Sequence, residues 1–173
     1  MAQHYRKTGT KRKAYIFVKK VCKMNEPELD KFIGDKYMKR LNAYNNSNWY
    51  KACLGPSELG VWRRAGELPL RWTNKSLENS ASSIGKAMKR KNGFKNKKIR
   101  AVKSISSMIT SSLDDFQKEK YLLPIVFQTD TGTRGRARLK FKTKGDIDDG
   151  CMRSIALTIS GAKEITVYYG IPK

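Results

Sequence analysis

The sequence predicts an α+β fold, in which a mainly helical and basic N-terminal module precedes a module of order β-α-β-β-α-β. Three observations support this prediction. Apolar side chains recur at helical spacing over residues 29–44, basic and apolar side chains alternate over residues 134–142, and strand-like and helix-like segments alternate from residue 99 onward. The apolar fraction of 39%, in a chain of 173 residues, is large enough to bury a core.

The chain is strongly basic. It carries 37 Lys and Arg against 15 Asp and Glu, which gives a formal net charge of +22. Such an excess repels itself in the compact state, and a polyanion relieves the repulsion. A membrane is not the expected partner, because no apolar run reaches about 18 residues and no helix-like segment has a wide apolar face. We expect a nucleic acid, bound tightly at low salt and weakly at high salt.

Cysteine and histidine are scarce in this chain. Cys22, Cys53 and Cys151 lie far apart and are odd in number, which is not the pattern of a disulfide framework. His4 is the only histidine, and no spacing of zinc ligands occurs. No signal-peptide pattern follows the basic N-terminus. We therefore expect an intracellular protein, cytoplasmic or nuclear, without a metal or cofactor.

The N-terminal half is predicted to contain a flexible basic arm and then helices. Residues 1–14 hold five Lys and Arg and no acid, which suits contact with phosphate. Residues 15–22 are β-branched and aromatic, which fits a strand or the start of a helix. The spacing over 29–44, after Pro27, predicts a helix whose apolar stripe packs into the core, and residues 49–54 are expected to form a short helix.

The next segments carry weaker patterns. Residues 54–72 resemble a helix-turn-helix with a short spacing between its helices, and the alternative is packed helices with Arg63 and Arg64 exposed. Residues 73–98 are polar and then basic, and we interpret them as a linker or surface loop. No acid occurs from Lys86 to Lys103, so this stretch is a candidate for contact with phosphate.

The C-terminal half is predicted to alternate strands and helices. Strands are expected at residues 99–102, 124–128, 134–142 and 164–170, and helices from Ser111 or Ser112 and over residues 146–161. Asp146 or Asp148 is expected near the N-cap of the second helix, and Gly161 is expected to end it. This order is the ferredoxin-like arrangement.

These elements divide the chain into three parts. They are a flexible arm at 1–14, a helical module with a basic linker at 15–95, and a ferredoxin-like domain at 96–173. The alternative is a single domain in which residues 15–22 supply the first strand and the intervening helices are an insertion. The chain length accommodates either organisation.

Residues 134–142 have the clearest alternation in the chain. Arg134, Arg136, Arg138 and Lys140 lie on one face of the expected strand, and small or apolar residues lie on the other. Like charges side by side destabilise a sheet, so we expect an anion on this basic face.

The same segment resembles the third-strand motif of the RNA recognition motif family. Arg134, Gly135, Ala137, Leu139 and Phe141 stand at the first, second, fourth, sixth and eighth positions of that motif. The resemblance covers residues 97–171 approximately, and it implies a ferredoxin-like sheet that binds RNA.

Members of this family stack bases on exposed aromatic side chains of the first and third strands. Arg100, Arg136 and Arg138 stand at those positions in this chain. Arginine favours bidentate contacts with phosphate. The resemblance therefore implies a sheet that binds the RNA backbone with low sequence specificity.

We expect a non-catalytic RNA-binding protein that is a structural part of a ribonucleoprotein, a viral nucleoprotein assembly or an oligomer. The residues expected to contact RNA are Lys86, Lys89, Arg90, Lys91, Lys97, Lys98, Arg100, Lys103, Arg134, Arg136, Arg138 and Lys140. Two alternatives stay open. One is a DNA-binding replication or regulatory factor that uses residues 54–72. The other is a nuclease that holds a metal ion on Asp146, Asp148 and Asp149. The competing interpretation of these acids is that they cap a helix and interact with its dipole.

Overall fold

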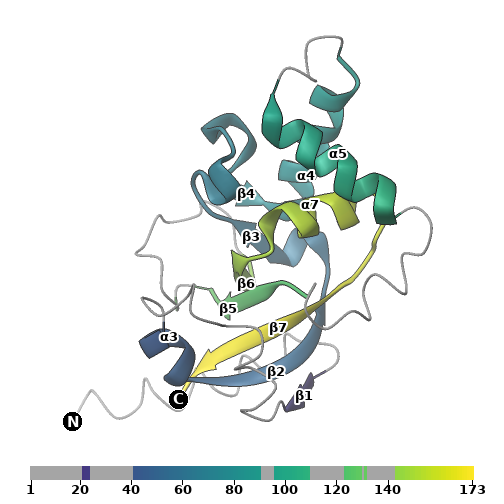
Figure 1. The fold of residues 1–173 in the computed structure, drawn as a ribbon. Coiled ribbons are helices and arrows are strands. Elements are labelled where there is room, and N and C mark those ends of the chain that lie inside the picture. Colours follow the sequence, from purple (N-terminus) through teal and green to yellow (C-terminus); the bar gives the residue numbers. More distant parts are fainter. Residues whose placement is uncertain (1–20, 24–40, 91–95, 110–122, 130, 132–142) are drawn as a thin grey trace.

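The computed structural model describes residues 21–23, 41–90, 96–109, 123–129, 131 and 143–173. Over these residues the fold is α+β, as predicted, with one mixed sheet of seven strands in the order β1-β2-β7-β5-β6-β3-β4 (Figure 1). The strands are β1 (Val21–Lys23), β2 (Ser47–Leu54), β3 (Leu59–Val61), β4 (Lys75–Ser76), β5 (Ile125–Gln128), β6 (Gly145–Asp149) and β7 (Ile165–Pro172).

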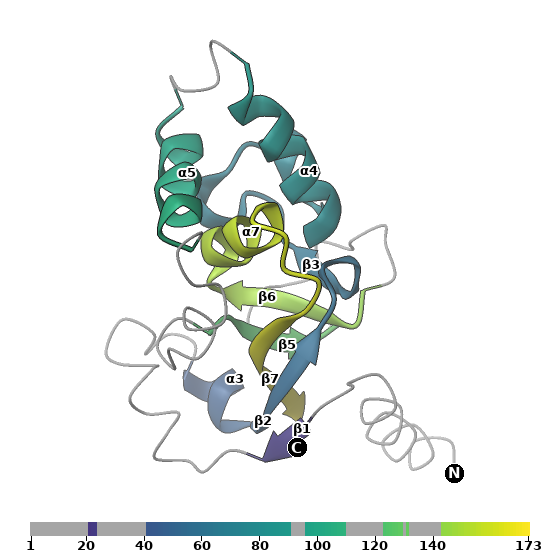
Figure 2. The same cartoon turned by 90° about the vertical axis from the view of Figure 1, so that its right-hand side faces the viewer.

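Helices lie against this sheet. The described α-helices are α3 (Leu41–Asn45), α4 (Leu77–Met88), α5 (Lys97–Ile109) and α7 (Cys151–Ile159). In Figures 1 and 2, α4 and α5 lie at one end of the molecule, α3 and β1 lie toward the other end, and α7 lies between the two helices and the strands. The short 3-10 helices are η2 (Pro56–Glu58), η3 (Ala65–Glu67) and η4 (Leu70–Trp72).

Two apolar cores occupy the two faces of the sheet. Val126 of β5 packs with side chains of α4, α5 and α7, whereas Ile125 and Phe127 pack with Tyr44 of α3. Successive side chains of a strand point to opposite faces, so one strand supplies both cores.

The pairing of β2 with β7 joins the two halves of the chain. The two strands pair antiparallel over eight residues, from Ser47 opposite Pro172 to Leu54 opposite Ile165. The strand expected at 164–170 is therefore confirmed. The short helix expected at 49–54 is wrong, because this segment alternates exposed and buried residues as a strand does: Lys51 is exposed and Ala52 is buried.

The segments before and after the boundary expected between residues 95 and 96 both contribute strands to this one sheet. Strand β2 pairs with β7, and β3 pairs in parallel with β6. The larger core likewise takes residues from before and after the boundary, such as Leu77 and Ile155. Over the described residues, the two halves share one sheet and one core.

The strand expected at 99–102 is wrong, because these residues lie in helix α5. Ile99, Val102 and Ile109 are buried and recur at helical spacing, which outweighs the strand propensity of the isolated segment. The side chain of Asn96 begins the helix by accepting a hydrogen bond of 2.9 Å from the backbone N–H of Lys98.

The linker expected at 73–98 is also wrong, because most of its described part is strand β4 and helix α4. The hydroxyl of Ser76 caps α4 by accepting a hydrogen bond of 3.2 Å from the backbone N–H of Asn79. Leu77, Ala81 and Ile84 are buried at helical spacing, so packing against α7 and the sheet stabilises the helix.

The helix expected over 146–161 begins only at Cys151. Residues 145–149 form strand β6, in which Asp146 pairs with Phe127 of β5. Gly150 separates the two elements with a left-handed backbone, φ 82°, that residues with a Cβ rarely adopt. Neither Asp146 nor Asp148 is therefore a helix cap. Gly161, with φ 97°, follows the end of α7 as expected.

Residues 54–72 form neither the helix-turn-helix that they resemble nor the packed α-helices of the alternative, although Arg63 and Arg64 are exposed as that alternative expects. They contain the end of β2, strand β3 and the three-residue 3-10 helices η2, η3 and η4. No recognition helix exists in this segment, so the feature that favoured a DNA-binding factor is not there.

The ferredoxin-like arrangement over residues 96–173 is not confirmed. Of its expected strands, the one at 124–128 is confirmed as β5, and the one at 99–102 is a helix. The expected basic strand at 134–142, the helix from Ser111 or Ser112 and the arm at 1–14 lie outside the described residues.

Candidate nucleic-acid interface

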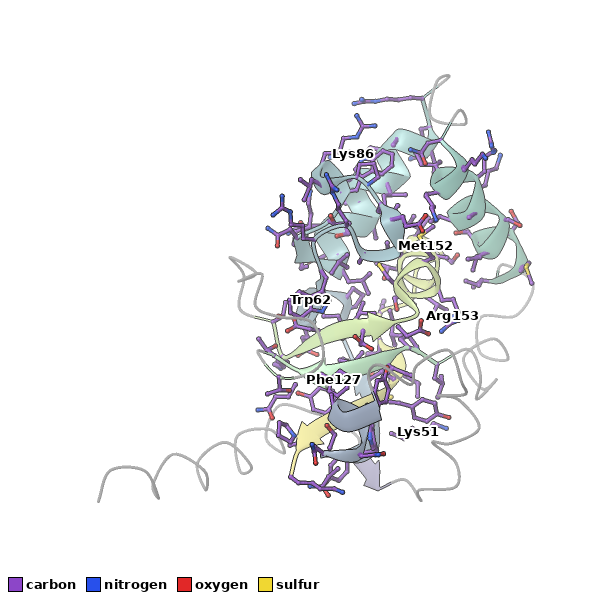
Figure 3. The ribbon with its side chains drawn as sticks, turned by 60° about the vertical axis from the view of Figure 1, so that its left-hand side comes forward. Lys51, Trp62, Lys86, Phe127, Met152 and Arg153 are labelled. Carbon is purple, nitrogen blue, oxygen red and sulfur yellow. The ribbon has the colours of Figure 1, made fainter. Side chains whose placement is uncertain are left out.

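The C-terminal end of α4 carries a basic surface. While Leu77, Ala81 and Ile84 of the helix are buried, Lys86 is exposed, and so are Lys89 and Arg90 just beyond it. The amphipathic spacing of the helix produces this division, because burial of one face leaves the opposite face to solvent. Lys86, labelled in Figure 3, lies toward the end of the molecule opposite Lys51.

Helix α5 adds a second row of cations. Ile99, Val102 and Ile109 are buried, and Lys97, Arg100 and Lys103 are exposed. No acid occurs in the first turn of this 13-residue helix. The positive end of the helix dipole therefore adds to the charge of the lysines there.

Lys98 of α5 has an ion-pair partner. Its ammonium group lies 2.6 Å from Oε2 of Glu67 in η3. This hydrogen bond, together with the charge of Lys98, holds the pKa of Glu67 below its ordinary value. One cation of the row is thus partly neutralised within the chain.

We define the α4–α5 basic surface as Lys86, Lys89, Arg90, Lys97, Lys98, Arg100 and Lys103. The sequence holds no Asp or Glu between Asn79 and Leu113, so the two helices contribute no acid close to these residues in the chain. Such a surface attracts polyanions and repels cations.

These seven residues are all among those predicted to contact nucleic acid, and they lie on or next to α4 and α5, the two helices at one end of the molecule (Figures 1 and 2). Arg100 was expected on a sheet, and this expectation is wrong because α5 carries it. The predicted contacts Lys91, Arg134, Arg136, Arg138 and Lys140 lie outside the described residues.

Sequence reasoning missed Arg71 and Trp72. Arg71 of η4 lies beside Lys86 and Arg90 around one pocket, and its guanidinium lies 4.6 Å from the ring centroid of Trp72. The adjacent Arg and Trp were the available signal, because cation–π contacts with arginine are a common use of tryptophan. Their position relative to α4 depends on the tertiary fold.

The acidic residues Asp146, Asp148 and Asp149 lie on strand β6. Asp146 and Asp148 are buried, and each accepts a hydrogen bond: from Thr143 Oγ1 at 3.3 Å and from the Tyr44 hydroxyl at 2.6 Å. Asp149 pairs with Arg153 at 2.8 Å. Burial raises the pKa of the nearby Tyr169 hydroxyl, and the charge of Asp146 raises it further.

These hydrogen bonds and the ion pair give the carboxylates a structural role. Within the part of the chain that the structure describes, no group of three or more His, Cys, Asp and Glu side chains is arranged to hold a metal ion. None of the described helices is long and apolar enough to cross a membrane. The chain matches no protein-family model, no curated protein and no solved structure.

Proposed function

We propose that this protein binds RNA without cleaving it, and that the α4–α5 basic surface contacts the phosphate backbone. The observation that carries this proposal is a set of exposed cations on two adjacent helices and directly after the first of them: Lys86, Lys89, Arg90, Lys97, Arg100 and Lys103. Like charges so placed repel one another, and phosphates relieve the repulsion while they release counterions. The preference for RNA rests on the resemblance of residues 134–141 to the RNA recognition motif.

Contacts of this kind position a nucleic acid and carry little sequence information. Lysine is a flexible point charge that binds phosphate irrespective of the base. We therefore propose low sequence specificity, as suits a structural component of a ribonucleoprotein assembly.

A pair of matched double variants tests this proposal. Lys89→Gln with Lys97→Gln removes two charges from the α4–α5 basic surface. Lys51→Gln with Lys173→Gln removes two exposed lysines elsewhere. Fluorescence anisotropy measures the affinity for a labelled single-stranded RNA between about 50 and 300 mM salt, where each lost phosphate contact reduces the slope of log affinity against log salt by about 0.7.

We expect the first double variant to reduce that slope by about 1.4, from two contacts, and the control to leave it close to the wild-type value. Equal slopes for the two double variants would overturn the assignment of the surface. Competition with duplex DNA and single-stranded DNA at fixed salt tests the preference for RNA, which tighter binding of either DNA would contradict.

A metal-dependent nuclease is the competing function that the sequence leaves open. The described residues do not favour it, because the buried Asp146 and Asp148 each already accept a hydrogen bond and belong to no group of three or more side chains that could hold a metal ion. Incubation of labelled RNA and DNA with Mg²⁺, and separately with EDTA, distinguishes the candidates. Cleavage that requires Mg²⁺ and is lost in Asp148→Asn would establish the nuclease and refute the non-catalytic proposal.

A further inference from the structure

A pocket of about 430 Å³ lies at the α4–α5 basic surface. Its walls come from η4, the C-terminal part of α4 and the N-terminal end of α5, which supply Arg71, Trp72, Lys86, Arg90 and Ile99 among other residues. Pockets that bind small ligands range from about 300 to 1,000 Å³, so this one is large enough for a unit the size of a nucleotide.

Three cations surround the pocket. Arg71, Lys86 and Arg90 are exposed, and none of the described residues that line the pocket with them is an acid. Among the described residues, none of the three forms an ion pair with an acid. Lys86 of α4 and Arg90, just beyond the end of that helix, both line the pocket, where their like charges repel each other. An anion in the pocket compensates this repulsion.

One of these cations is held in place by an aromatic ring. The guanidinium of Arg71 lies 4.6 Å from the centroid of the buried Trp72 ring. A cation–π contact restricts the arginine before any ligand arrives, and so reduces the entropy lost on binding. A guanidinium so placed offers paired N–H donors to phosphate and a planar surface to a base.

The other described residues that line the pocket are uncharged. The partly exposed Ala87 and the largely buried Trp72 and Ile99 contribute a small apolar surface, and Ser83 and Asn96 contribute polar groups. The N-terminal end of α5 also reaches the pocket through Asn96 and Ile99, and the helix dipole places partial positive charge there. The pocket therefore combines phosphate-binding cations with an apolar wall suited to a base.

We propose that this pocket binds one unpaired nucleotide of RNA, with its phosphate on Arg71, Lys86 and Arg90 and its base against the apolar wall. This inference rests on the proposed function, and it adds a site that distinguishes single strands from duplexes. A free nucleoside monophosphate has the same chemistry, so the experiment includes both sources of the ligand.

The test compares two double variants that make the same substitutions. Arg71→Met with Lys86→Met removes two cations from the pocket. Arg63→Met with Lys51→Met removes an exposed arginine and an exposed lysine that line neither the pocket nor the α4–α5 basic surface. Calorimetric titrations with AMP, inorganic phosphate, a single-stranded RNA and a duplex RNA measure the affinities, and circular dichroism confirms that each variant is folded.

We expect the wild-type protein to bind AMP more tightly than inorganic phosphate. The pocket variant should lose at least about tenfold in affinity for AMP and for single-stranded RNA, and the control should lose much less. Duplex RNA offers no unpaired nucleotide, so the pocket variant should lose less affinity for duplex RNA than for single-stranded RNA.

Three results would overturn the proposal. The first is equal affinity of the two variants for AMP and for single-stranded RNA. The second is binding of inorganic phosphate as tightly as AMP, which removes the role of the base. The third is a pocket variant that loses affinity for free AMP and keeps its affinity for single-stranded RNA, which would show that RNA is not the source of the ligand. If the wild-type protein binds no RNA, the proposed function fails, and the AMP titrations still test the pocket.

Discussion

The ammonium group of Lys98 lies 2.6 Å from the carboxylate of Glu67, which joins helix α5 to the 3-10 helix η3. The Glu67 side chain is 83% exposed, and an ion pair so exposed contributes little to stability. Under the proposed function, the ion pair affects RNA binding, because Glu67 would compete with RNA phosphate for Lys98 of the α4–α5 basic surface.

Glu67→Gln is therefore expected to raise the affinity for RNA. The substitution frees Lys98 to contact phosphate, which should increase the slope of log affinity against log salt by up to about 0.7. Anisotropy titrations at several salt concentrations measure both quantities. Glu164→Gln makes the same change of charge outside the two helices and serves as the control. If Glu164→Gln raises the affinity and slope as much as Glu67→Gln does, the gain comes from net charge alone.

Two glycine substitutions are expected to shift stability in opposite directions. A Cβ at Gly170 in β7 would lie 2.9 Å from the Trp49 ring, so Gly170→Ala should destabilise the fold by about 1–3 kcal/mol. A Cβ at Gly85 in α4 meets no atom within 4 Å, so Gly85→Ala should stabilise the helix by up to about 1 kcal/mol. Urea unfolding measures the free energy of unfolding of both variants. A Gly170→Ala variant as stable as the wild type would contradict the close packing of β7 against Trp49.

Part of this fold could be predicted from the sequence. The strands at β5 and β7 were recognisable from their runs of β-branched and aromatic residues. The pairing of β2 with β7 joins residues more than a hundred positions apart, such as Leu54 and Ile165, and no local pattern encodes it. At β6, the left-handed Gly150 separates strand from helix where the sequence suggested one continuous helix.

The candidate site could also be predicted only in part. The density of cations from Lys86 to Lys103 is a property of the sequence, and it identified the basic surface although both helices were missed. The spacing of Ile99, Val102 and Ile109 was the available signal for α5. The position of Arg71 next to Lys86 follows from tertiary packing, so it could not be read from the sequence.

The stability of the fold is expected to decrease at alkaline pH through Tyr169. Its pKa in the folded protein is raised by burial and by Asp146, whereas the unfolded chain ionises near the ordinary tyrosine value of about 10. The neutral Tyr169 hydroxyl therefore contributes its full stabilisation below about pH 10. As the pH rises above about 10, the free energy of unfolding decreases by up to about 1.4 kcal/mol per pH unit.

Urea unfolding at several pH values above the ordinary tyrosine pKa measures this loss. Tyr169→Phe removes the ionising group together with its 2.6 Å hydrogen bond to the Lys144 carbonyl, so it should be less stable at neutral pH and lose less stability as the pH rises. The same dependence on pH in the wild type and Tyr169→Phe would refute this role of Tyr169.

The hydrogen bond between Tyr44 and Asp148 is expected to stabilise the core that lies between α3 and the sheet. The hydroxyl of Tyr44 donates to Oδ2 of Asp148 at 2.6 Å, and both side chains are buried. Tyr44→Phe should cost about 1.5–3 kcal/mol, as hydrogen bonds to charged groups do. A double-mutant cycle with Asp148→Ala, which removes the acceptor, measures the coupling by urea unfolding, and a coupling energy close to zero would contradict a direct interaction.

Protection of lysines by bound RNA tests the central claim most directly. The folded protein is treated with an amine-acetylating reagent, with and without a saturating single-stranded RNA, and mass spectrometry measures the reactivity of each lysine. We expect RNA to protect Lys86, Lys89 and Lys97 of the α4–α5 basic surface, while the exposed Lys51 and Lys173 react as in the free protein. RNA that binds and leaves Lys86, Lys89 and Lys97 as reactive as before would show that these two helices are not the binding surface.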